Sequence, residues 1–466
     1  MTGFGGRIEG ARRWMAAAAV GAMALAAPLQ AETLTDALIQ SYENSPLLDQ
    51  QRALLRVQDE GVATAVSRLR PTLNFQAQYS KSLGEGSIGV RTGATLNLIL
   101  DWTVLDGGQR YLRIGAAKEA VLAARHGLTQ VEQQVLLNAV SAYLTLRRNL
   151  LIVDARESNV RLITQQLRAA EDRFEVGEVT RTDVSISEAR LAGARSQLAA
   201  ARGDVDVARE QYRLAIGELP TGTLAALPPA PEIPPSVERA QRLALQINPA
   251  ILGLQHEVTA ARLLVGAAEA DRLPTVDFQA SAGQRRNDQS SAVVALQGNV
   301  PIYNGGRLSS QQRQAQANLD ANRAQLAQQS RQVVNAVGQA YAILQVSRAQ
   351  IVASREQVRS AQLAFEGFRE EAQLGARTTL DVLDAEQELL DARTALLEAQ
   401  ADAQFAVYGV LSEIGLLTVD HLGLRVERYD PSLYYRAVAD APAVSPVGTD
   451  RGGRLDRVLR RFKRQN

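Results

Sequence analysis

The sequence predicts an internally duplicated α+β membrane protein in which each copy combines two β-strands with a long, coiled-coil-like helical hairpin. Three observations predict this class: a repeat at a fixed offset over most of the chain, four segments of alternating apolar and polar residues, and two long segments with a seven-residue apolar period. Only 5% of the 466 residues are aromatic and cysteine is absent, which favours long helices with narrow apolar stripes and excludes disulfides and thiolate metal sites.

The N-terminal residues 1–31 are predicted to be a signal peptide. Three arginines precede an apolar run over 14–27, and Ala31 stands before a proposed cleavage at Glu32. A basic start, a short apolar centre and a small residue at the cut are typical of secretory signals. The run is shorter than the roughly 20 apolar residues that span a bilayer. We therefore expect an exported protein that meets any membrane without transmembrane helices.

A glycine corner that occurs twice marks the duplication. Asp106-Gly107-Gly108 corresponds to Asn304-Gly305-Gly306, and Gly305 lies 198 residues after Gly107. The same offset relates Tyr143 to Tyr341 and Ile216-Gly217 to Ile414-Gly415. Upstream of the glycines the offset is 203, so the first copy holds five extra residues there, which belong in a loop. The repeats are assigned to residues 32–219 and 236–417, joined by a proline-rich linker over 220–235 and followed by residues 418–466.

One helix and then two strands are predicted upstream of each corner, and the apolar period in the strands is two. They cover about 72–80 and 90–104 in the first copy and about 275–283 and 292–302 in the second. Alternation over about ten residues suits strands that face lipid on one side and water on the other, and the alternative is the half-buried sheet of a soluble sandwich. Because a closed barrel needs about eight strands or more, and open edges are costly in lipid, membrane strands here require several chains to share one barrel.

A long helical hairpin is predicted downstream of each corner. Apolar residues recur every seven positions, which indicates supercoiling against a neighbouring helix. The hairpins turn near 177–183 and 375–381, where Gly177 and Gly375 mark the tips. From Arg307 to the second tip the helix would be about 100 Å long at 1.5 Å per residue. The recurring positions are Ala139, Leu146, Val153, Val160 and Leu167, and then Val337, Leu344, Ile351, Val358 and Phe365.

These features together resemble the TolC-like outer-membrane efflux proteins. The resemblance rests on the duplicated corner, on the tip sequences GEVTRTDV and GARTTLDVLDAEQELLDA, and on the signal peptide, and it covers nearly all of residues 32–417. It implies a homotrimer whose three chains build a 12-stranded β-barrel in the outer membrane, continuous with an α-helical barrel in the periplasm. It also implies an equatorial segment made by the linker and by residues 418–466, which end in a basic tail expected to be disordered. The segment VERYDPSLYYR is similar to the type I secretion and multidrug branch of the family.

The function that the resemblance implies is a passive exit duct and not an enzyme. Such a duct works in a tripartite efflux or type I secretion system with a periplasmic adaptor and an inner-membrane pump or ABC transporter, is surrounded by outer-membrane lipid, and exports small molecules or proteins. With a net charge of +1 the chain has no overall attraction to nucleic acid. The alternative is a periplasmic coiled-coil adaptor or scaffold, although adaptors usually carry one hairpin. The cargo stays open.

The resemblance also implies a periplasmic gate at the hairpin tips. It matches Asp381 and Asp384 with acidic rings, Arg377 with an arginine that ties the tips shut, and Asp183 with the partner of that arginine. Three-fold symmetry would place six carboxylates around one axis, which favours cations and raises their pKa values. The alternative is that these are ordinary carboxylates in a first helical turn, where the helix dipole favours them. Ala372 stands where the family often has tyrosine, so the latch would depend more on Arg377 and Asp183, or the resting state would be leakier.

Cofactors and metals are not expected. The three histidines, His126, His256 and His421, are far apart in the sequence and show no ligand spacing. The serines lack the context of a nucleophile, and the chain has no phosphate-binding glycine loop.

Overall fold

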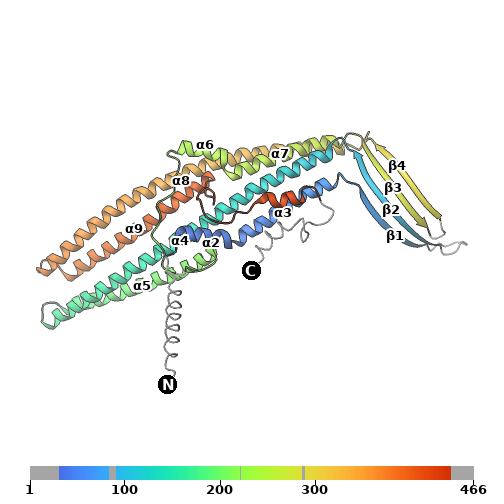
Figure 1. The fold of residues 1–466 in the computed structure, drawn as a ribbon. Helices are drawn as coiled ribbons and strands as arrows, with labels where there is room; N and C mark the ends of the chain where they lie inside the picture. Colours follow the sequence, from blue (N-terminus) through green and yellow to red (C-terminus); the bar gives the residue numbers. More distant parts are fainter. Residues whose placement is uncertain (1–30, 83–90, 221, 286–288, 442–466) are drawn as a thin grey trace, which may run out of the picture.

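The computed structural model describes residues 31–82, 91–220, 222–285 and 289–441. Residues 1–30 of the predicted signal peptide and the basic end of the C-terminal tail lie outside the described residues, as do residues 83–90, which hold the five extra residues of the first copy. The chain is elongated, with a β-sheet at one end and the two hairpin tips at the other (Figure 1).

The element order repeats almost without change in the two copies. The first copy contains α2 (Leu34–Asn44), α3 (Pro46–Ser67), β1 (Thr72–Ser82), β2 (Arg91–Leu105), α4 (Gln109–Glu175) and α5 (Arg181–Ile216). The second contains α6 (Val237–Ile247), α7 (Pro249–Ala270), β3 (Thr275–Arg285), β4 (Gln289–Asn299), α8 (Arg307–Gln373) and α9 (Thr379–Ile414), and a short helix α10 (Pro431–Val438) follows. The matched helices have equal lengths, which are 67 residues for α4 and α8 and 36 for α5 and α9.

Each copy has two helices before its first strand, where the sequence predicted one. The break falls at Pro46 and Pro249, each of which is the first residue of the second helix. Proline has no N–H to donate to the preceding turn, and it disfavours helical geometry in the residue before it. Ser45 and Asn248 then cap the new helices, since their side chains accept from the backbone N–H groups of Leu48 and Ala250.

The four strands form one antiparallel sheet in the order β1-β2-β3-β4. Directly paired residues share a face, and apolar residues oppose one another across all four strands: Phe75 with Leu98, Leu98 with Ala282, and Ala282 with Ala292. The opposite face carries Gln76 with Asn97 and Asp101 with Gln279, although Ile99 and Val293 also lie on it. The predicted alternation is therefore confirmed by the register.

Two details of the strands differ from the prediction. A register shift between Thr103 and Leu105 leaves Val104 as an extra residue, so that Leu105 opposes Val276 on the apolar face. Such bulges bend a strand near the margin of a sheet. Strand β4 ends at Asn299, three residues before the predicted end, because Pro301 cannot donate a ladder hydrogen bond.

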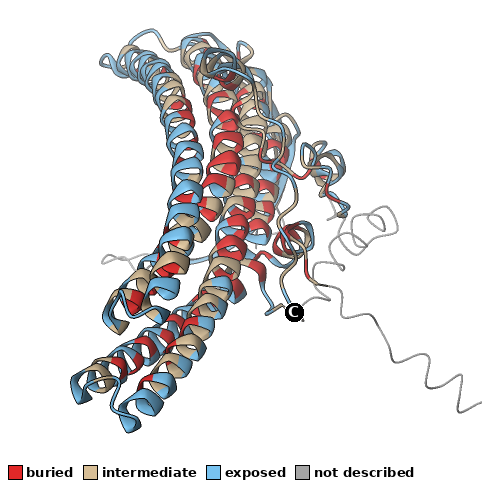
Figure 2. Cartoon of the chain, turned by 90° about the vertical axis from the view of Figure 1, so that its left-hand side faces the viewer, coloured by how far each residue is buried: buried red, intermediate tan, exposed pale blue. Residues whose placement is uncertain are grey.

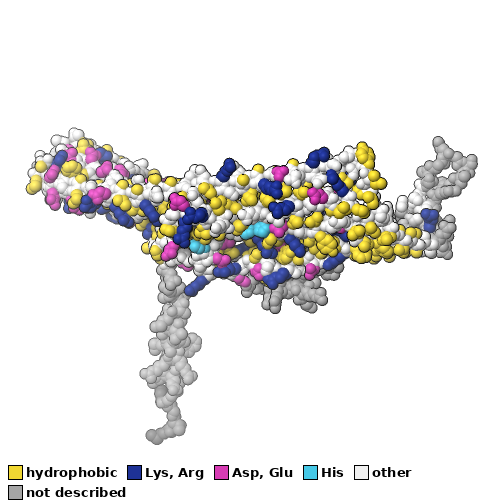
Figure 3. All heavy atoms as spheres, turned by 90° about the horizontal axis from the view of Figure 1, so that it is seen from above, with side chains coloured by type: hydrophobic (Ala, Val, Ile, Leu, Met, Phe, Trp, Pro, Cys, Tyr) yellow, Lys and Arg dark blue, Asp and Glu magenta, His cyan; other side chains and the backbone are white. Residues whose placement is uncertain are grey.

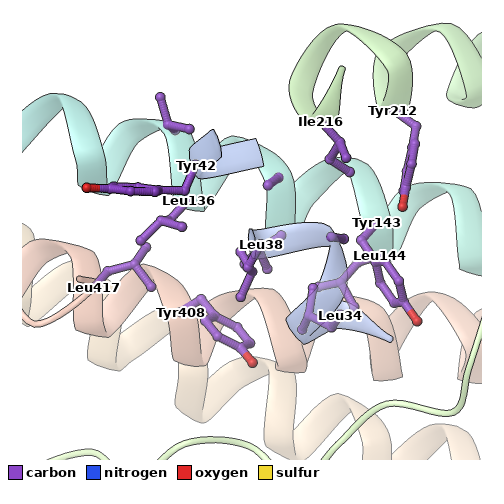
Figure 4. Packing of buried hydrophobic residues seen from close by; sticks show 14 of the residues in the cluster. Leu34, Leu38, Tyr42, Leu136, Tyr143, Leu144, Tyr212, Ile216, Tyr408 and Leu417 are labelled. Atoms are coloured by element: carbon purple, nitrogen blue, oxygen red, sulfur yellow. The ribbon is translucent and has the colours of Figure 1, made fainter. Parts of the chain in front are cut away.

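The main core lies at the middle of the long helices, where α2 and the linker meet α4, α5 and α9. Figure 4 shows Leu34, Leu38 and Tyr42 of α2 packed among residues of these helices. Two buried tyrosines hold Glu32 there: Tyr212 Oη donates to Glu32 Oε1 at 2.5 Å, and Tyr143 Oη lies 3.0 Å from the Glu32 carbonyl oxygen. In the second copy Tyr341 Oη donates to the Pro234 carbonyl at 2.7 Å. Tyr143 Oη also lies 3.2 Å from the Ala225 carbonyl oxygen, so the duplicated Tyr143 and Tyr341 tie the proline-rich linker to both hairpins.

The predicted stripe with a seven-residue period is buried or half-buried along both long helices. Val337, Leu344 and Phe365 of α8 are buried, whereas the hairpin tips are largely exposed (Figure 2). A second row of buried residues on α8 begins at Tyr341. It does not keep the seven-residue period, because Arg348 and Arg355 stand one and two heptads after Tyr341. Buried small or polar residues one position earlier, Ser347, Ser354 and Ala361, take over.

Candidate functional site: corners and hairpin tips

Both corners turn on two glycines with left-handed backbone angles. Gly107 and Gly108 have φ of +62° and +84°, and Gly305 and Gly306 have +65° and +85°. Glycine adopts these angles without the steric cost that other residues incur. Gly107 is also confined, since a Cβ atom built on it would lie 2.6 Å from Leu273 Cδ1.

The acid or amide of each corner caps its long helix from two residues upstream of the N-cap position. The N-cap positions are Gly108 and Gly306, neither of which has a capping side chain. Asp106 nevertheless accepts from the backbone N–H groups of Gly108 at 3.1 Å and Arg110 at 3.0 Å, and it pairs with Arg110 Nε at 2.7 Å. Asn304 makes a longer contact, 3.4 Å from the N–H of Leu308. The first corner is therefore the more firmly held of the two.

The hairpin tips have the same backbone design in both copies. Gly177 and Gly375 have φ of +80° and +78°. The residue after each glycine donates back to the last helical turn, Glu178 N to Arg173 O and Ala376 N to Glu371 O, both at 2.9 Å. This pairing is the Schellman motif that ends helices at a left-handed glycine.

Asp183 and Asp381 cap the returning helices. Each belongs to a capping box in which a threonine, Thr180 or Thr378, accepts from the N–H of the aspartate while the carboxylate accepts from the N–H and hydroxyl of the threonine. These backbone and side-chain hydrogen bonds lower the pKa of both aspartates. Both carboxylates therefore have a local structural role, which the sequence offered as the alternative to a gate.

Arg377 is held on its own hairpin. Its Nε donates to Glu371 Oε2 at 2.8 Å, and its guanidinium lies 4.6 Å from the centre of the Phe368 ring. The hydrogen bond to Glu371 raises the pKa of Arg377. Among the described residues of one chain, no ion pair joins Arg377 to Asp183. A closing contact between these two side chains thus requires either another protomer or a rearranged tip.

Asp384 connects the two hairpins of the chain. It pairs with Arg190 of α5, which the sequence reasoning did not select. Close to it lies a buried polar pair that was also missed: Glu386 of α9 accepts from Asn159 Nδ2 of α4 at 2.7 Å. A signal for Glu386 existed, because Val382, Leu383, Leu389 and Leu390 flank it at helical spacing and are buried.

The histidines gave no such signal. His126 of α4 and His256 of α7 stack with their ring centres 5.4 Å apart, and His256 Nδ1 lies 2.7 Å from Glu119 Oε2. They are separated by 130 residues in the sequence, so only the fold brings them together. The described part of the chain contains no group of three residues able to hold a metal ion.

The chemical character of the surface changes along the length of the molecule. Hydrophobic side chains gather over the sheet end, whereas acidic and basic side chains are interspersed at the tips (Figure 3). On the apolar face of the sheet Phe75, Val294 and Leu296 are each about 70% exposed. No described helix is both long enough and apolar enough to cross a membrane.

A sheet with an exposed apolar face and a polar face, joined through glycine corners to hairpins about 100 Å long, defines a membrane channel with a long helical duct. The model of the outer membrane efflux protein family matches residues 37–218 and 241–413, and the chain belongs to this family. The two matched segments correspond to the two copies.

Curated relatives and solved structures agree with this membership. The chain is 38% identical over 417 residues to the outer membrane efflux protein BepC of Brucella suis, covering 88% of this chain and 91% of BepC. It is 28% identical to the outer membrane protein TolC of Escherichia coli, covering 84% of each chain. Among solved structures, the Campylobacter jejuni CmeC outer membrane channel aligns with a TM-score of 0.74 at 16% identity, covering 88% of this chain and 90% of that one.

The protein is therefore an efflux channel of the outer membrane that extends into the periplasm. Proteins of this family act as trimeric channels with adaptor and inner-membrane pump partners. The alternative of a periplasmic adaptor is not supported, because both copies carry a hairpin and a strand pair that match the channel family.

Proposed function

We propose that three copies of this chain form one exit duct, in which their strands complete a 12-stranded barrel and their six hairpins complete an α-helical barrel. The observation that carries the proposal is the sheet itself. Among the described residues β1 and β4 each have one hydrogen-bonded neighbour, so both margins of the sheet are open. Unpaired backbone groups cost several kcal/mol each in lipid, and closure with further copies removes them.

The duct would receive its cargo at the hairpin tips from a periplasmic adaptor and an inner-membrane pump or ABC transporter. Relatives differ in what they serve. One is the alkaline protease secretion protein AprF of Pseudomonas aeruginosa, 30% identical over 61% of this chain, and another is the outer membrane protein of a toluene efflux pump of Pseudomonas putida, 24% identical over 75%. Both protein export and small-molecule efflux are therefore compatible with this fold, and we assign the choice of cargo to the pump.

The gate would lie where the tips converge. Asp381 and Asp384 stand three residues apart on α9, so three chains would bring six carboxylates around the axis. Arg377 sits one turn away, fixed by Glu371 and Phe368. In this proposal tip closure depends on contacts between neighbouring protomers, with Asp183 as the acceptor available to Arg377.

Membrane fractionation tests the duct. Expressed in a Gram-negative host, the full chain is expected in the outer-membrane fraction, to run as a trimer on unheated gels, and to form channels in planar bilayers. A chemical crosslinker applied to intact cells should capture an adaptor together with the trimer. Recovery as a soluble periplasmic monomer would contradict the proposal and favour a scaffold.

A further inference from the structure

The contact between the two hairpins of one chain, here called the hairpin seam, lies close to the tips. Leu383 of α9 is buried against Ile163 of α4 and against Leu191 and Ala194 of α5. One turn above it, on the same side of α9, stands Glu386. The seam must loosen whenever the second hairpin moves relative to the first.

Glu386 is an unusual residue for such a seam because it is almost fully buried. It is 4% exposed, and its partner Asn159 is 7% exposed. Asn159 Nδ2 donates to Glu386 Oε1 at 2.7 Å, whereas Glu386 Oε2 has no hydrogen-bond partner among the described residues. Buried carboxylates are costly when charged and incompletely paired, so the neutral acid suits this place better than the ion.

The titration of Glu386 falls in the physiological range. Burial raises its pKa from 4.5 to about 7, and the hydrogen bond from Asn159 opposes the rise only in part. Several charged groups carried by the packed elements at this level are bound elsewhere, and Glu188, Arg195 and Arg355 are exposed. On α4 and α5, Arg156 donates to Gln197, Arg161 donates to Ser158, Arg202 binds Glu157, and Arg190 pairs with Asp384 of α9. On α8 and α9, Glu366 accepts from Gln362, Glu388 accepts from Gln357, and Arg369 lies over the Phe365 ring.

We propose that Glu386 and Asn159 form a proton-dependent latch of the hairpin seam, firm while the carboxyl is neutral and weakened when it is charged. The inference rests on the proposed function, because a looser seam matters to transport only if the tips close the duct. The sign follows from linkage. The closed seam binds the proton more tightly than separated helices do, so its stabilisation is complete below pH 4.5 and is lost as the pH rises through about 7.

The size of the pH effect on the seam follows from the difference between the pKa of Glu386 in the closed seam and in the open seam. If separation restores the ordinary pKa of glutamate, the equilibrium between closed and open seam shifts toward opening by up to about 300-fold per chain between acid and alkaline pH. Three latches in a trimer would make the response steeper.

Channel recordings across pH 5 to 8 test the latch. The wild-type trimer is expected to show conductance that rises with pH. Glu386→Gln keeps the size of the side chain and cannot ionise, so its seam should stay closed and its conductance should change little over this range. Asn159→Leu removes the donor that favours the ion, so the rise should move to higher pH. Glu398→Gln, at an exposed position of the same helix, is the matched control and should follow the wild type.

A second measurement reports on the seam without channel activity. Because the chain has no cysteine, spin labels can be placed at Arg161→Cys on α4 and Glu388→Cys on α9, both exposed. The distance distribution between the labels should broaden and lengthen from pH 5 to pH 8, and the Glu386→Gln background should remove that change.

The outcomes separate the two proposals. A Glu386→Gln trimer whose conductance and label distances follow pH as in the wild type would overturn the latch, as would an equal loss of pH response in Glu398→Gln. A protein that forms no channel at any pH would instead contradict the exit duct, while the spin labels would still decide whether the seam responds to protons.

Discussion

Single residues at the corner show how the two copies have diverged. Gly107 and Gly305 occupy the same position and adopt nearly the same left-handed φ. A Cβ atom on Gly107 would collide with the Leu273 side chain, whereas one on Gly305 would meet open space. The same glycine-to-alanine substitution can therefore be compared at two equivalent positions that differ only in their surroundings.

Gly107→Ala is expected to destabilise the protein more than Gly305→Ala. Both variants bear about 1 kcal/mol for a left-handed alanine, and only Gly107→Ala adds a steric cost of about 1–3 kcal/mol. The temperature at which the trimer dissociates on gels measures the difference. Equal losses in the two variants would show that the contact with Leu273 relaxes at no cost.

Asp59 of α3 is a second residue whose environment sets its chemistry. It is fully buried beside Leu55, Val62 and the C-terminal Tyr429, and both of its carboxylate oxygens lack hydrogen-bond partners among the described residues. Burial raises the pKa of Asp59 to about 6, although the charge of Arg125 opposes this. A raised carboxyl pKa means that stability present at acid pH is lost as the pH rises through about 6.

Asp59→Asn should therefore stabilise the protein at pH 7.5 by about 1–3 kcal/mol and have little effect at pH 4.5. Thermal unfolding in detergent at the two pH values measures this. Glu43→Gln, an exposed acid on α2, is the control and should change stability at neither pH. Destabilisation of Asp59→Asn at pH 7.5 would indicate that the charged carboxylate is paired, through water for example.

At the scale of elements, we propose that the closure of the hairpin tip depends on Arg377. Arg377 binds Glu371 and covers Phe368, so it holds the end of α8 against the turn. Arg377→Ser removes both contacts and a positive charge, and we expect it to raise single-channel conductance several-fold because the tip loosens. Arg359→Ser also breaks an ion pair, with Glu356, but further from the tip, and should leave conductance unchanged. Unchanged conductance in Arg377→Ser as well would remove this arginine from the latch of the tips.

Much of the element order could be predicted because local chemistry dictates it. The alternation of apolar and polar residues indicated which residues share a face of the sheet, as the pair Phe75 and Leu98 shows. The glycines at 107, 177, 305 and 375 all have positive φ, so their positions located the corners and tips. The breaks at Pro46 and Pro249 were missed, although each proline follows a residue suited to capping a helix.

The contacts between distant elements could not be predicted in the same way. His126 and His256 stack only because α7 lies along α4, and nothing near either residue in the sequence records that. Within one chain Arg377 binds Glu371, six residues earlier on the same hairpin, and not Asp183 of the other hairpin. The bulge at Val104 likewise reflects how β2 must bend into its corner.

At the scale of the whole molecule, the duplication explains why the two hairpins and the two strand pairs of one chain are aligned with each other. Equal helix lengths in the two copies place both tips at the same level, and equal corners place both strand pairs in the same sheet. Each chain therefore contributes two similar units to a closed duct, so three chains give six hairpins. The differences between the copies, such as the buried Glu386 and the confined Gly107, then mark the places where the units are not interchangeable.

The last prediction concerns the two faces of the sheet, because neighbouring residues of β1 are expected to face lipid and water in turn. Phe75 lies on the apolar face and Gln76 on the polar face. Arginine on the lipid face of a membrane barrel costs about 2–4 kcal/mol near the bilayer midplane, whereas arginine in the lumen changes selectivity. Phe75→Arg should therefore lower the amount of trimer in the outer membrane.

Gln76→Arg should leave the amount of trimer unchanged and lower the conductance for cations, since three added positive charges would line the lumen. Quantifying the heat-sensitive trimer in isolated outer membranes, followed by bilayer recordings of both variants, compares the two faces directly. If Gln76→Arg abolished the trimer while Phe75→Arg preserved it, the faces would be assigned the wrong way round. If both variants assembled equally well, the apolar face would not be in contact with lipid, and the sheet would have to be shielded by protein.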